Sequence, residues 1–217
     1  MRIVAFVPLR LRNSTRLPGK QMKTLVDRPL CEYLFETMDK MDFLPEKYVY
    51  CSDDGIIKHL PETVSFLRRS EELDENEITG LDIIDRFVDD IDADIYVLLH
   101  TTQPFTKIGS VKKGLEAVLS GEYDSAFSAL EMQDYLWRDG KPYNYEPTEL
   151  PRTQELVPVY KETGGFYIFT SQVYRTMRRR IGSKPFICPV DQVEAVDIDT
   201  PEDFAFAEVV ARGLIRS

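Results

Sequence analysis

Apolar runs and helix-spaced apolar residues alternate along most of the chain. The run from Ile3 to Val7 is short and continuous, as in a strand covered on both faces. After Pro29, apolar residues keep helical spacing as far as Met41, and Lys47 to Cys51 is again strand-like. The alternation continues through residue 130. It predicts an α/β fold with a mostly parallel sheet and helices on both faces.

One segment interrupts this pattern. Residues 131–161 are rich in Trp, Tyr, Pro, Asp and Glu and lack a clear period, which is long for a plain connection in a compact domain. We expect a functional or dimer-forming insertion there, within a single domain spanning 1–217. The other expected elements are a short helix at 56–60, strands at 64–67, 94–99, 125–130, 165–169 and 184–190, and helices from Thr79, from a Ser110 cap, at 171–180 and from Thr200.

Charge and cysteine content exclude several classes of protein. Lys and Arg number 27 and Asp and Glu 37, a formal net charge of −10, so a nucleic-acid partner is not expected. Three cysteines without a CxxC pair argue against a disulfide framework or a zinc site and favour reducing cytosol. No apolar run is long enough for a signal peptide or membrane span, so we expect a cytoplasmic protein without a membrane partner.

A basic loop follows the first expected strand. Pro18 fixes one backbone torsion and Gly19 permits a positive φ, so Arg16 and Lys20 are held in a stiff turn. Ligands of such sheets sit beyond the carboxyl ends of the strands, which favours an anion site suited to a triphosphate over a merely solvated loop. Between Pro8 and Arg28, a single acid, Asp27, accompanies six basic residues: Arg10, Arg12, Arg16, Lys20, Lys23 and Arg28.

The loop is not one of the common phosphate-binding loops. Ser14 stands at the first glycine position of GxxxxGK[ST], Gln21 replaces its Ser or Thr, and no GxGxxG occurs. The stretch VPLRLRNSTRLPGKQ instead resembles the signature RxxSxRLPGKN of the cytidylyltransferases that activate acidic sugars, the acylneuraminate (CMP-sialic acid synthetase) type. One extra residue precedes Ser14, so either Arg10 or Arg12 takes the arginine position, and Gln21 replaces Asn.

The resemblance implies a fold and a nucleotide site. The fold would be a Rossmann-like sheet of the nucleotide-diphospho-sugar transferase type. Arg16 and Lys20 would be catalytic, and Arg10, Arg12, Ser14 and Gln21 would bind the nucleotide. Cys51-Ser52-Asp53-Asp54 is similar to the S-T-D of the family, and residues 67–73 resemble its R-P-x-E-L, which implies that Arg69 lies near the cytosine base.

Two further stretches concern the acceptor. Residues 98–105 take the place of L-L-Q-P-T-S-P-L, so His100 stands where a ligand-contacting Gln is usual; Thr102 is a further candidate contact, and Gln103 also departs from the pattern. Residues 152–160 and 164–168 resemble the segment near the acidic sugar, with Thr163 at an Asn position. The resemblance thus implies that Arg152, Gln154 and Tyr160 bind the sugar; taken alone, Arg152 could equally be a surface arginine. The planar fork of arginine suits a carboxylate.

The segment Val196-Asp197-Ile198-Asp199-Thr200 precedes the last expected helix. Thr200 as N-cap and Pro201 at the first helical position form a strong helix start. A spacing of two on a strand-like step points Asp197 and Asp199 to the same side, as Mg²⁺ held by hard oxygen ligands requires. The D-I-D-T of the family places its metal-binding aspartates here. The alternatives are acids favoured only by the helix dipole, or the DxD of a glycosyltransferase.

Together these features predict a Mg²⁺-dependent enzyme. It would transfer CMP from CTP to an acylneuraminate-like 2-keto sugar acid and release pyrophosphate. The alternatives are another acceptor such as an eight-carbon keto-deoxy acid, a glycosyltransferase of similar architecture, or an inactive nucleotide-sugar-binding domain. In the insertion, Tyr135, Trp137, Tyr143 and Tyr145 are typical interface residues and predict a homodimer.

Overall fold

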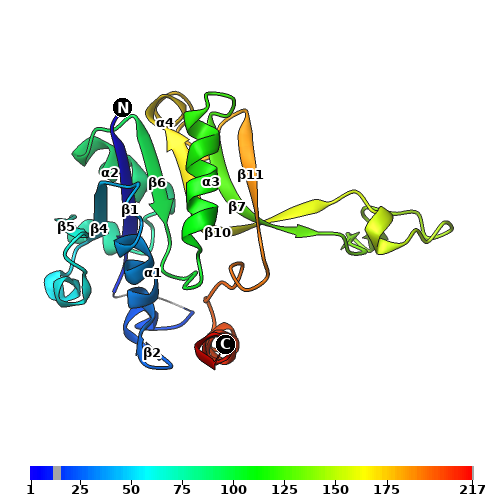
Figure 1. The fold of residues 1–217 in the computed structure, drawn as a ribbon, viewed down its shortest axis with the longest axis horizontal. Helices are drawn as coiled ribbons and strands as arrows, with labels where there is room; N and C mark the ends of the chain where they lie inside the picture. Colours follow the sequence, from blue (N-terminus) through cyan, green and yellow to red (C-terminus); the bar gives the residue numbers. More distant parts are fainter. Residues whose placement is uncertain (12–15, 217) are drawn as a thin grey trace.

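The computed structural model describes residues 1–11 and 16–216 and is built on a seven-stranded sheet (Figure 1). The strand order is β11-β7-β10-β6-β1-β4-β5. Every pair is parallel except those that β10 makes with β6 and β7, which confirms the predicted mostly parallel sheet. The strands are β1 (Ile3–Leu9), β4 (Glu46–Cys51), β5 (Ser65–Arg68), β6 (Ile95–Leu99), β7 (Ser125–Met132), β10 (Val159–Thr170) and β11 (Pro185–Val190).

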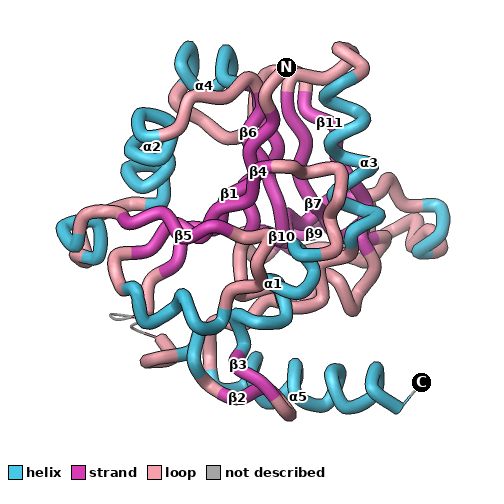
Figure 2. The backbone as a smooth tube through the Cα atoms, turned by 60° about the vertical axis from the view of Figure 1, so that its left-hand side comes forward, coloured by secondary structure: helices cyan, strands magenta, loops and turns pink. Residues whose placement is uncertain are grey.

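Helices cover both faces of this sheet, as predicted (Figure 2). On one face, α1 (Leu30–Asp39) and α3 (Ile108–Leu119) pack in a buried cluster with alternate residues of β1, β4 and β6. On the other, α2 (Gly80–Asp90) and α4 (Ser171–Met177) pack on the intervening residues. Phe6 of β1, for example, stacks on Phe87 of α2 with ring centroids 3.9 Å apart. The strands therefore read as continuous apolar runs because both faces are buried.

A third apolar cluster joins the two ends of the chain. Helix α5 (Pro201–Arg216) lies below the sheet beside the hairpin of β2 (Thr24–Leu25) and β3 (Arg28–Pro29) (Figure 1). Leu17 and Leu25 are buried here against Ile198 and the α5 residues Ala207 and Ala211. The predicted helix start is confirmed: Thr200 Oγ1 accepts from the Asp203 amide at 3.2 Å, and Asp203 accepts from the Thr200 amide at 2.8 Å.

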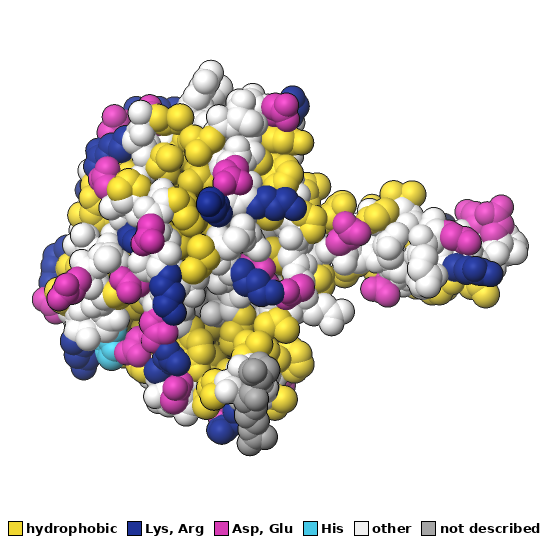
Figure 3. Space-filling model, viewed as in Figure 1, with side chains coloured by type: hydrophobic (Ala, Val, Ile, Leu, Met, Phe, Trp, Pro, Cys, Tyr) yellow, Lys and Arg dark blue, Asp and Glu magenta, His cyan; other side chains and the backbone are white. Residues whose placement is uncertain are grey.

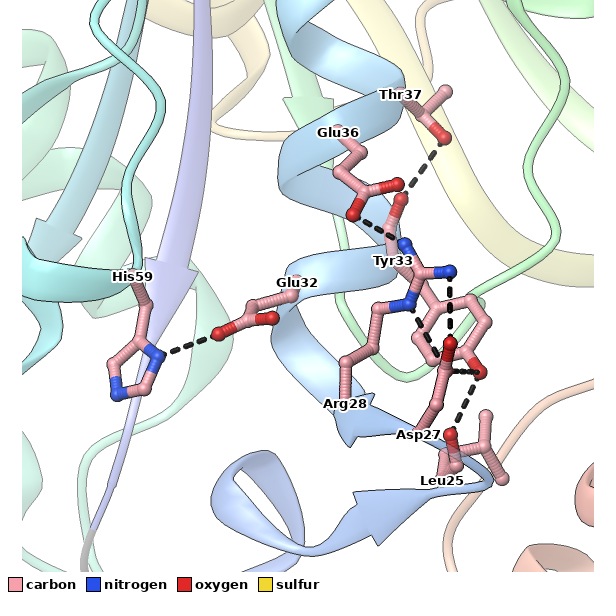
Figure 4. A network of polar contacts seen from close by, with 8 residues as sticks. All are labelled: Leu25, Asp27, Arg28, Glu32, Tyr33, Glu36, Thr37 and His59. Atoms are coloured by element: carbon pink, nitrogen blue, oxygen red, sulfur yellow. Dashed lines mark hydrogen bonds and ion pairs between the residues drawn. The ribbon is translucent and has the colours of Figure 1, made fainter.

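A polar network fastens the β2–β3 hairpin to α1 (Figure 4). Tyr33 donates to the Leu25 carbonyl at 2.7 Å, and Arg28 pairs with both Asp27 and Glu36. On the other side of α1, Glu32 accepts from His59 at 2.6 Å, so His59 is engaged in a structural contact. The hairpin that follows the basic loop is thus held in place on both sides of its turn.

Residues 131–161 form an arm that projects from the domain (Figures 1 and 3). Its base is not irregular: β7 and β10 continue their antiparallel pairing outward, with Tyr160 opposite Glu131. Beyond them lie the two-residue strands β8 (Trp137–Arg138) and β9 (Lys141–Pro142) and a 3-10 turn at Thr153–Glu155. The strands of the arm show no alternation of apolar and polar residues in the sequence because no core covers them. A dimer-forming role for the arm stays a prediction.

Three expected boundaries were wrong in detail. Helix α3 begins at Ile108 after Lys107, and Ser110 donates to the buried Glu194 at 2.8 Å instead of capping. Helix α4 ends at Met177 because Arg178 adopts a left-handed conformation, φ 50°. The short helix near 56–60 is a 3-10 helix, Asp54–His59. Within the described ranges, no helix combines the length and apolarity needed to cross a membrane.

Candidate functional site

A cavity of about 370 Å³ lies at the carboxyl ends of β1 and β6. This is the edge at which ligands of parallel sheets are expected. Its walls come from Pro8 near the end of β1 and Arg10 just after it, from the turn 16–21, from His100 after β6, from Asp199, and from the start of α2. The basic loop and the D-I-D segment, separated by most of the chain, therefore meet at one site.

The turn from Leu17 to Lys20 is built as the sequence predicts. The Lys20 amide donates to the Leu17 carbonyl at 3.2 Å, and Gly19 has φ +65°, the left-handed value that the third position of a Pro-Gly turn needs. Leu17 is buried against Ile198 in the third apolar cluster. The turn thus has an apolar anchor, and its two flanking cations are fixed relative to the segment 197–199.

Both of the predicted catalytic cations pair with Asp199. Arg16 Nη2 lies 2.8 Å from Asp199 Oδ2, and Lys20 Nζ lies 2.9 Å from Oδ1. Lys20 also donates to the Ile198 carbonyl at 2.9 Å, and only 12% of its side chain is exposed. Arg16 is 66% exposed, so its charge faces solvent. The carboxylate holds two cations side by side at the cavity wall, where an anionic ligand could replace it as their partner.

Asp197 and Asp199 lie on a segment that is hydrogen-bonded to the loop after β6. The Ile198 amide donates to the Thr102 carbonyl at 2.9 Å, and Ile198 itself is buried between the two outward-facing aspartates. No strand is assigned here, but burial alternates over residues 197–199 as a two-residue step requires. Asp197 is exposed, yet partial desolvation of the Asp197 carboxylate raises its pKa. The charge of Asp199 also raises this pKa, and a hydrogen bond from Thr102 lowers it.

These two carboxylates are the metal ligands that the sequence predicts. Among the described residues no group of three or more His, Cys, Asp or Glu side chains could hold a metal ion. Two carboxylates fit Mg²⁺ only when substrate phosphates and water complete its oxygen shell, which is its usual mode in phosphate-binding sites. The donor chemistry therefore fits a metal that arrives with a nucleotide.

Arg10 lines the same cavity as Arg16. Its Nη2 donates to the Ile78 carbonyl at 3.0 Å, while its buried Nε has no partner in the described chain. Burial, followed by the charge of Arg69, lowers the pKa of Arg10. Gln21 is buried at the same wall with its side-chain oxygen unpaired among the described residues. Arg12 and Ser14 lie outside the described residues.

Arg69 is held by hydrogen bonds and an ion pair within the chain. Its side chain is 0% exposed and donates to the Leu9 carbonyl at 3.0 Å and to Asp74 at 2.6 Å. It therefore ties the ends of β1 and β5 together behind the cavity. Its Nε and Nη1 have no partner within the described chain. The predicted contact with a base stays a prediction.

His100 is neutral at the cavity wall. Its Nδ1 lies 2.6 Å from the Gly164 carbonyl, which can only accept, so Nδ1 carries the hydrogen and Nε2 is an acceptor. Burial lowers the pKa of His100 to about 4, and the charge of Arg180 acts in the same direction. Like the Gln usual at this position, neutral His100 offers one donor and one acceptor.

Gln103 and Thr163, the other departures, pack together behind His100. Gln103 is 1% exposed, and neither its side-chain oxygen nor its nitrogen has a partner in the described chain. A Cβ at Gly165 would lie 2.7 Å from Gln103 Oε1, so a larger residue there would require the Gln103 side chain to move. Thr163 donates to Ser128 Oγ at 2.7 Å. Both side chains are thus buried, but only that of Thr163 is hydrogen-bonded within the described chain.

The predicted sugar-binding residues lie on the arm. Arg152 and Gln154 are exposed near its 3-10 turn, and Tyr160 donates to Glu131 at 2.9 Å on the outward strand pair. Of the described residues that line the cavity, none comes from the arm. Conversely, sequence reasoning missed the wall formed by Ile78, Gly80 and Ile83. The signal was available, because the Thr79 capping box fixes where α2 starts.

Comparison with known proteins assigns the family. The family model described as Cytidylyltransferase matches residues 4–212. The chain belongs to this family. A CMP-N,N'-diacetyllegionaminic acid synthase of Legionella pneumophila is 27% identical over 227 residues, covering 96% of this chain and 95% of that protein. A 3-deoxy-manno-octulosonate cytidylyltransferase of Acaryochloris marina is 26% identical over 246 residues, covering 96% and 97%.

Solved structures share the fold of this cytidylyltransferase. A CMP:2-keto-3-deoxy-manno-octonic acid synthetase complexed with CTP superposes with a TM-score of 0.68 at 20% identity, covering 100% of both chains. This likeness confirms the predicted Rossmann-like nucleotidyltransferase fold. The matched relatives activate different sugar acids, so the comparisons establish the family but not the acceptor.

Proposed function

We propose that this cytidylyltransferase transfers CMP from CTP to a 2-keto sugar acid and releases pyrophosphate. One observation carries the proposal: Arg16 and Lys20, on a stiff Pro-Gly turn, converge on Asp199 at the cavity beyond β1 and β6. Two fixed cations suit the β- and γ-phosphates of a nucleotide, and membership of the cytidylyltransferase family supports CTP as that nucleotide.

The chemistry is an in-line substitution at the α-phosphorus. The anomeric hydroxyl of the sugar acid forms the new P–O bond and releases its proton to water as the bond to the bridging oxygen of the leaving pyrophosphate breaks. No covalent enzyme intermediate is needed, so the chain contributes placement and charge neutralisation. Lys20, held by the Ile198 carbonyl and Asp199, and Arg16 would exchange their shared carboxylate for phosphate oxygens; Arg10 borders the same space.

Asp197 and Asp199 would hold Mg²⁺ in this scheme. When bound, the ion would neutralise charge on the phosphate oxygens. As Arg16 and Lys20 turn to the triphosphate, Asp199 is released from both ion pairs and becomes available as an oxygen ligand. Thr102, which hydrogen-bonds Asp197, would keep that carboxylate oriented beside it.

We also propose that the arm packs against a second copy of the chain. Large apolar side chains are exposed along it: Trp137 is 63% exposed, Leu150 66% and Val157 78%. Burying such anchors against a partner is the usual role of an exposed aromatic and aliphatic set. Light scattering on a sizing column should give the mass of a dimer at micromolar concentration, and a monomer would refute this part.

The test of the function has two stages. First, CTP, UTP and GTP are compared for protection against thermal unfolding; a specific nucleotide at 100 times its Kd adds roughly 2.7 kcal/mol. CTP alone should protect, and equal protection by UTP would favour a glycosyltransferase. Second, pyrophosphate release is assayed with CTP and a panel of eight- and nine-carbon 2-keto sugar acids. CTP protection without pyrophosphate for any acid would identify a nucleotide-binding domain without this activity.

A further inference from the structure

A second cavity of about 540 Å³ adjoins the first. Gly80, at the start of α2, lines both. The rest of its wall includes Glu162 at the base of the arm and the segment 179–182 that follows α4. Sequence reasoning assigned no ligand contact to this segment.

Arg180 is the distinctive residue of this wall. It is half-buried, and its Cζ lies 3.7 Å from the centroid of the Tyr167 ring, so the planar guanidinium lies over the ring face. Stacking of this kind fixes an arginine while leaving its N–H edge free to donate. The Tyr167 hydroxyl donates to Glu162 at 2.8 Å, which in turn fixes the ring.

Arg175 and Arg178 differ from Arg180 in having acidic partners, whereas Arg179, which lines the same cavity, donates to Met177 Sδ at 2.9 Å. Arg175 pairs with Asp92 at 2.8 Å, and Arg178 pairs with Asp82 at 2.9 Å and with Asp85. Arg180 makes no ion pair with any described residue. It is therefore a positioned cation whose charge is not neutralised by a direct partner, beside a cavity, in a protein of net charge −10.

Arg180 lines the second cavity, and the Tyr167 ring on which it stacks lies 6.1 Å, centroid to centroid, from the ring of His100 at the first. Its charge contributes to lowering the pKa of His100, which lines the first cavity. Burial raises the pKa of Tyr167, and on that hydroxyl Arg180 and Asp197 act in opposite directions. Tyr167 and His100 thus lie within reach both of the stacked arginine and of the proposed phosphate and metal end.

We propose that Arg180 receives the carboxylate of the acceptor sugar acid and so determines that the acceptor is an acid. The inference rests on the proposed function. In a 2-keto sugar acid the carboxylate and the anomeric hydroxyl share one carbon. A carboxylate held by two N–H groups of Arg180 therefore places the attacking hydroxyl next to the first cavity, where the α-phosphorus would lie. Arg152, on the arm, lines neither cavity among the described residues.

The test compares Arg180→Gln with Arg175→Gln, a matched change on α4 at an exposed arginine that lines neither cavity. For each variant KM is measured separately for the best acid of the panel and for CTP, and CTP protection against unfolding reports an intact nucleotide site. Arg180→Gln should raise KM for the acid roughly 10- to 100-fold, as loss of a charge-assisted hydrogen bond predicts, and leave KM for CTP unchanged. Arg175→Gln should match the wild type.

A carboxamide analogue of the acid sharpens the result. It lacks the charge that Arg180 would receive, so wild type and Arg180→Gln should use it equally poorly; a penalty from Arg180→Gln as large as that for the acid would overturn the carboxylate assignment. An unchanged KM for the acid in Arg180→Gln also overturns it while leaving the proposed function intact. A wild type that releases no pyrophosphate with any acid overturns both. If Arg180→Gln loses CTP protection, Arg180→Lys is tested instead, because lysine keeps the charge but not the planar guanidinium. A raised KM for the acid in Arg180→Lys supports the role of Arg180, and an unchanged KM contradicts it.

Discussion

The opening loop and the arm both carry arginines predicted to bind anions, yet the fold treats them differently. Arg16 and Lys20 flank a turn anchored by buried Leu17 and meet Asp199 within one chain. Arg152 and Gln154 sit on a projecting arm whose large apolar side chains face outward (Figure 3). The first region brings its charged side chains together within one chain, and the second is an exposed surface for which we propose a partner.

The comparison shows which structural conditions hold a charged side chain in place. A cation is held in place when its backbone is tied to a core and its side chain has a defined partner; both conditions hold for Lys20 and, through stacking on Tyr167, for Arg180. Within the part of the chain that the structure describes, the arm's charged side chains make local contacts, such as Arg138 over the Tyr143 ring at 4.7 Å. Five predictions test this contrast, in order of decreasing expected effect.

Lys20→Ala should lower the rate of pyrophosphate release by roughly 10³-fold or more, because it removes a fixed charge facing the leaving group. The fold should persist, since Lys20 lies outside the apolar clusters. Lys23→Ala, an exposed lysine three residues on, is the control and should retain normal turnover. Near-normal release by Lys20→Ala would remove the opening loop from the reaction.

Asp199→Asn should change how turnover depends on the Mg²⁺ concentration. The change keeps the shape but removes the charge that Arg16 and Lys20 share. Loss of an outer-sphere partner of a metal site lowers activity roughly 10- to 100-fold. Because Asp199 would bind the ion directly, we expect at least this loss of activity at a fixed Mg²⁺ concentration. Titrating Mg²⁺ against turnover measures it, with Glu202→Gln on the exposed first turn of α5 as control. Unchanged Mg²⁺ dependence would contradict the metal role.

His100→Gln should make folding less sensitive to acid. The pKa of His100 falls from 6.5 to about 4 on burial, so its neutral form stabilises the fold fully above pH 6.5, and that contribution is lost as the pH falls towards 4. At pH 5 the variant should recover up to about 2 kcal/mol of unfolding free energy relative to wild type. The arm contains no histidine, so this effect belongs to the cavity region. Parallel denaturant curves at pH 5 and 7.5 that show no difference between the proteins would contradict it.

Arg152→Gln should raise KM for the acid by about tenfold if the arm of a second copy reaches the site, the size expected for one charge-assisted hydrogen bond. KM for CTP should not change. Arg138→Gln, also exposed on the arm, is the matched control. If both variants match the wild type while the protein is a dimer, the arm serves assembly and contributes no sugar contact through Arg152.

Gly19→Ala and Gly140→Ala impose the same backbone strain in the two regions. Both glycines have positive φ, +65° and +73°, and a Cβ at either would meet no described atom within 4 Å. Each change should therefore cost about 1 kcal/mol of stability. Only Gly19→Ala should also raise KM for CTP, because it alone displaces Lys20. Equal nucleotide affinity in both variants would show that the stiff turn is not needed for binding.

Sequence reasoning succeeded where a residue's role follows from its neighbours in the chain. The apolar runs of β1, β4 and β6 and the apolar faces of α1 and α2 are local patterns, so their existence was predictable. The antiparallel direction of β10 was not, because a strand pattern carries no direction. The β7–β10 extension into the arm was also missed, since strands without a core show no alternation.

The sequence by itself determined the layered sheet, the Pro18-Gly19 turn and the same-side spacing of Asp197 and Asp199, because each depends on backbone torsions and periods within a few residues. The tertiary structure alone decided that Lys20 meets Asp199, that Arg69 is turned towards Leu9, and that Arg180 rather than Arg152 borders the second cavity. These contacts join distant segments, and packing of the apolar clusters, not local pattern, sets which side chains face one another.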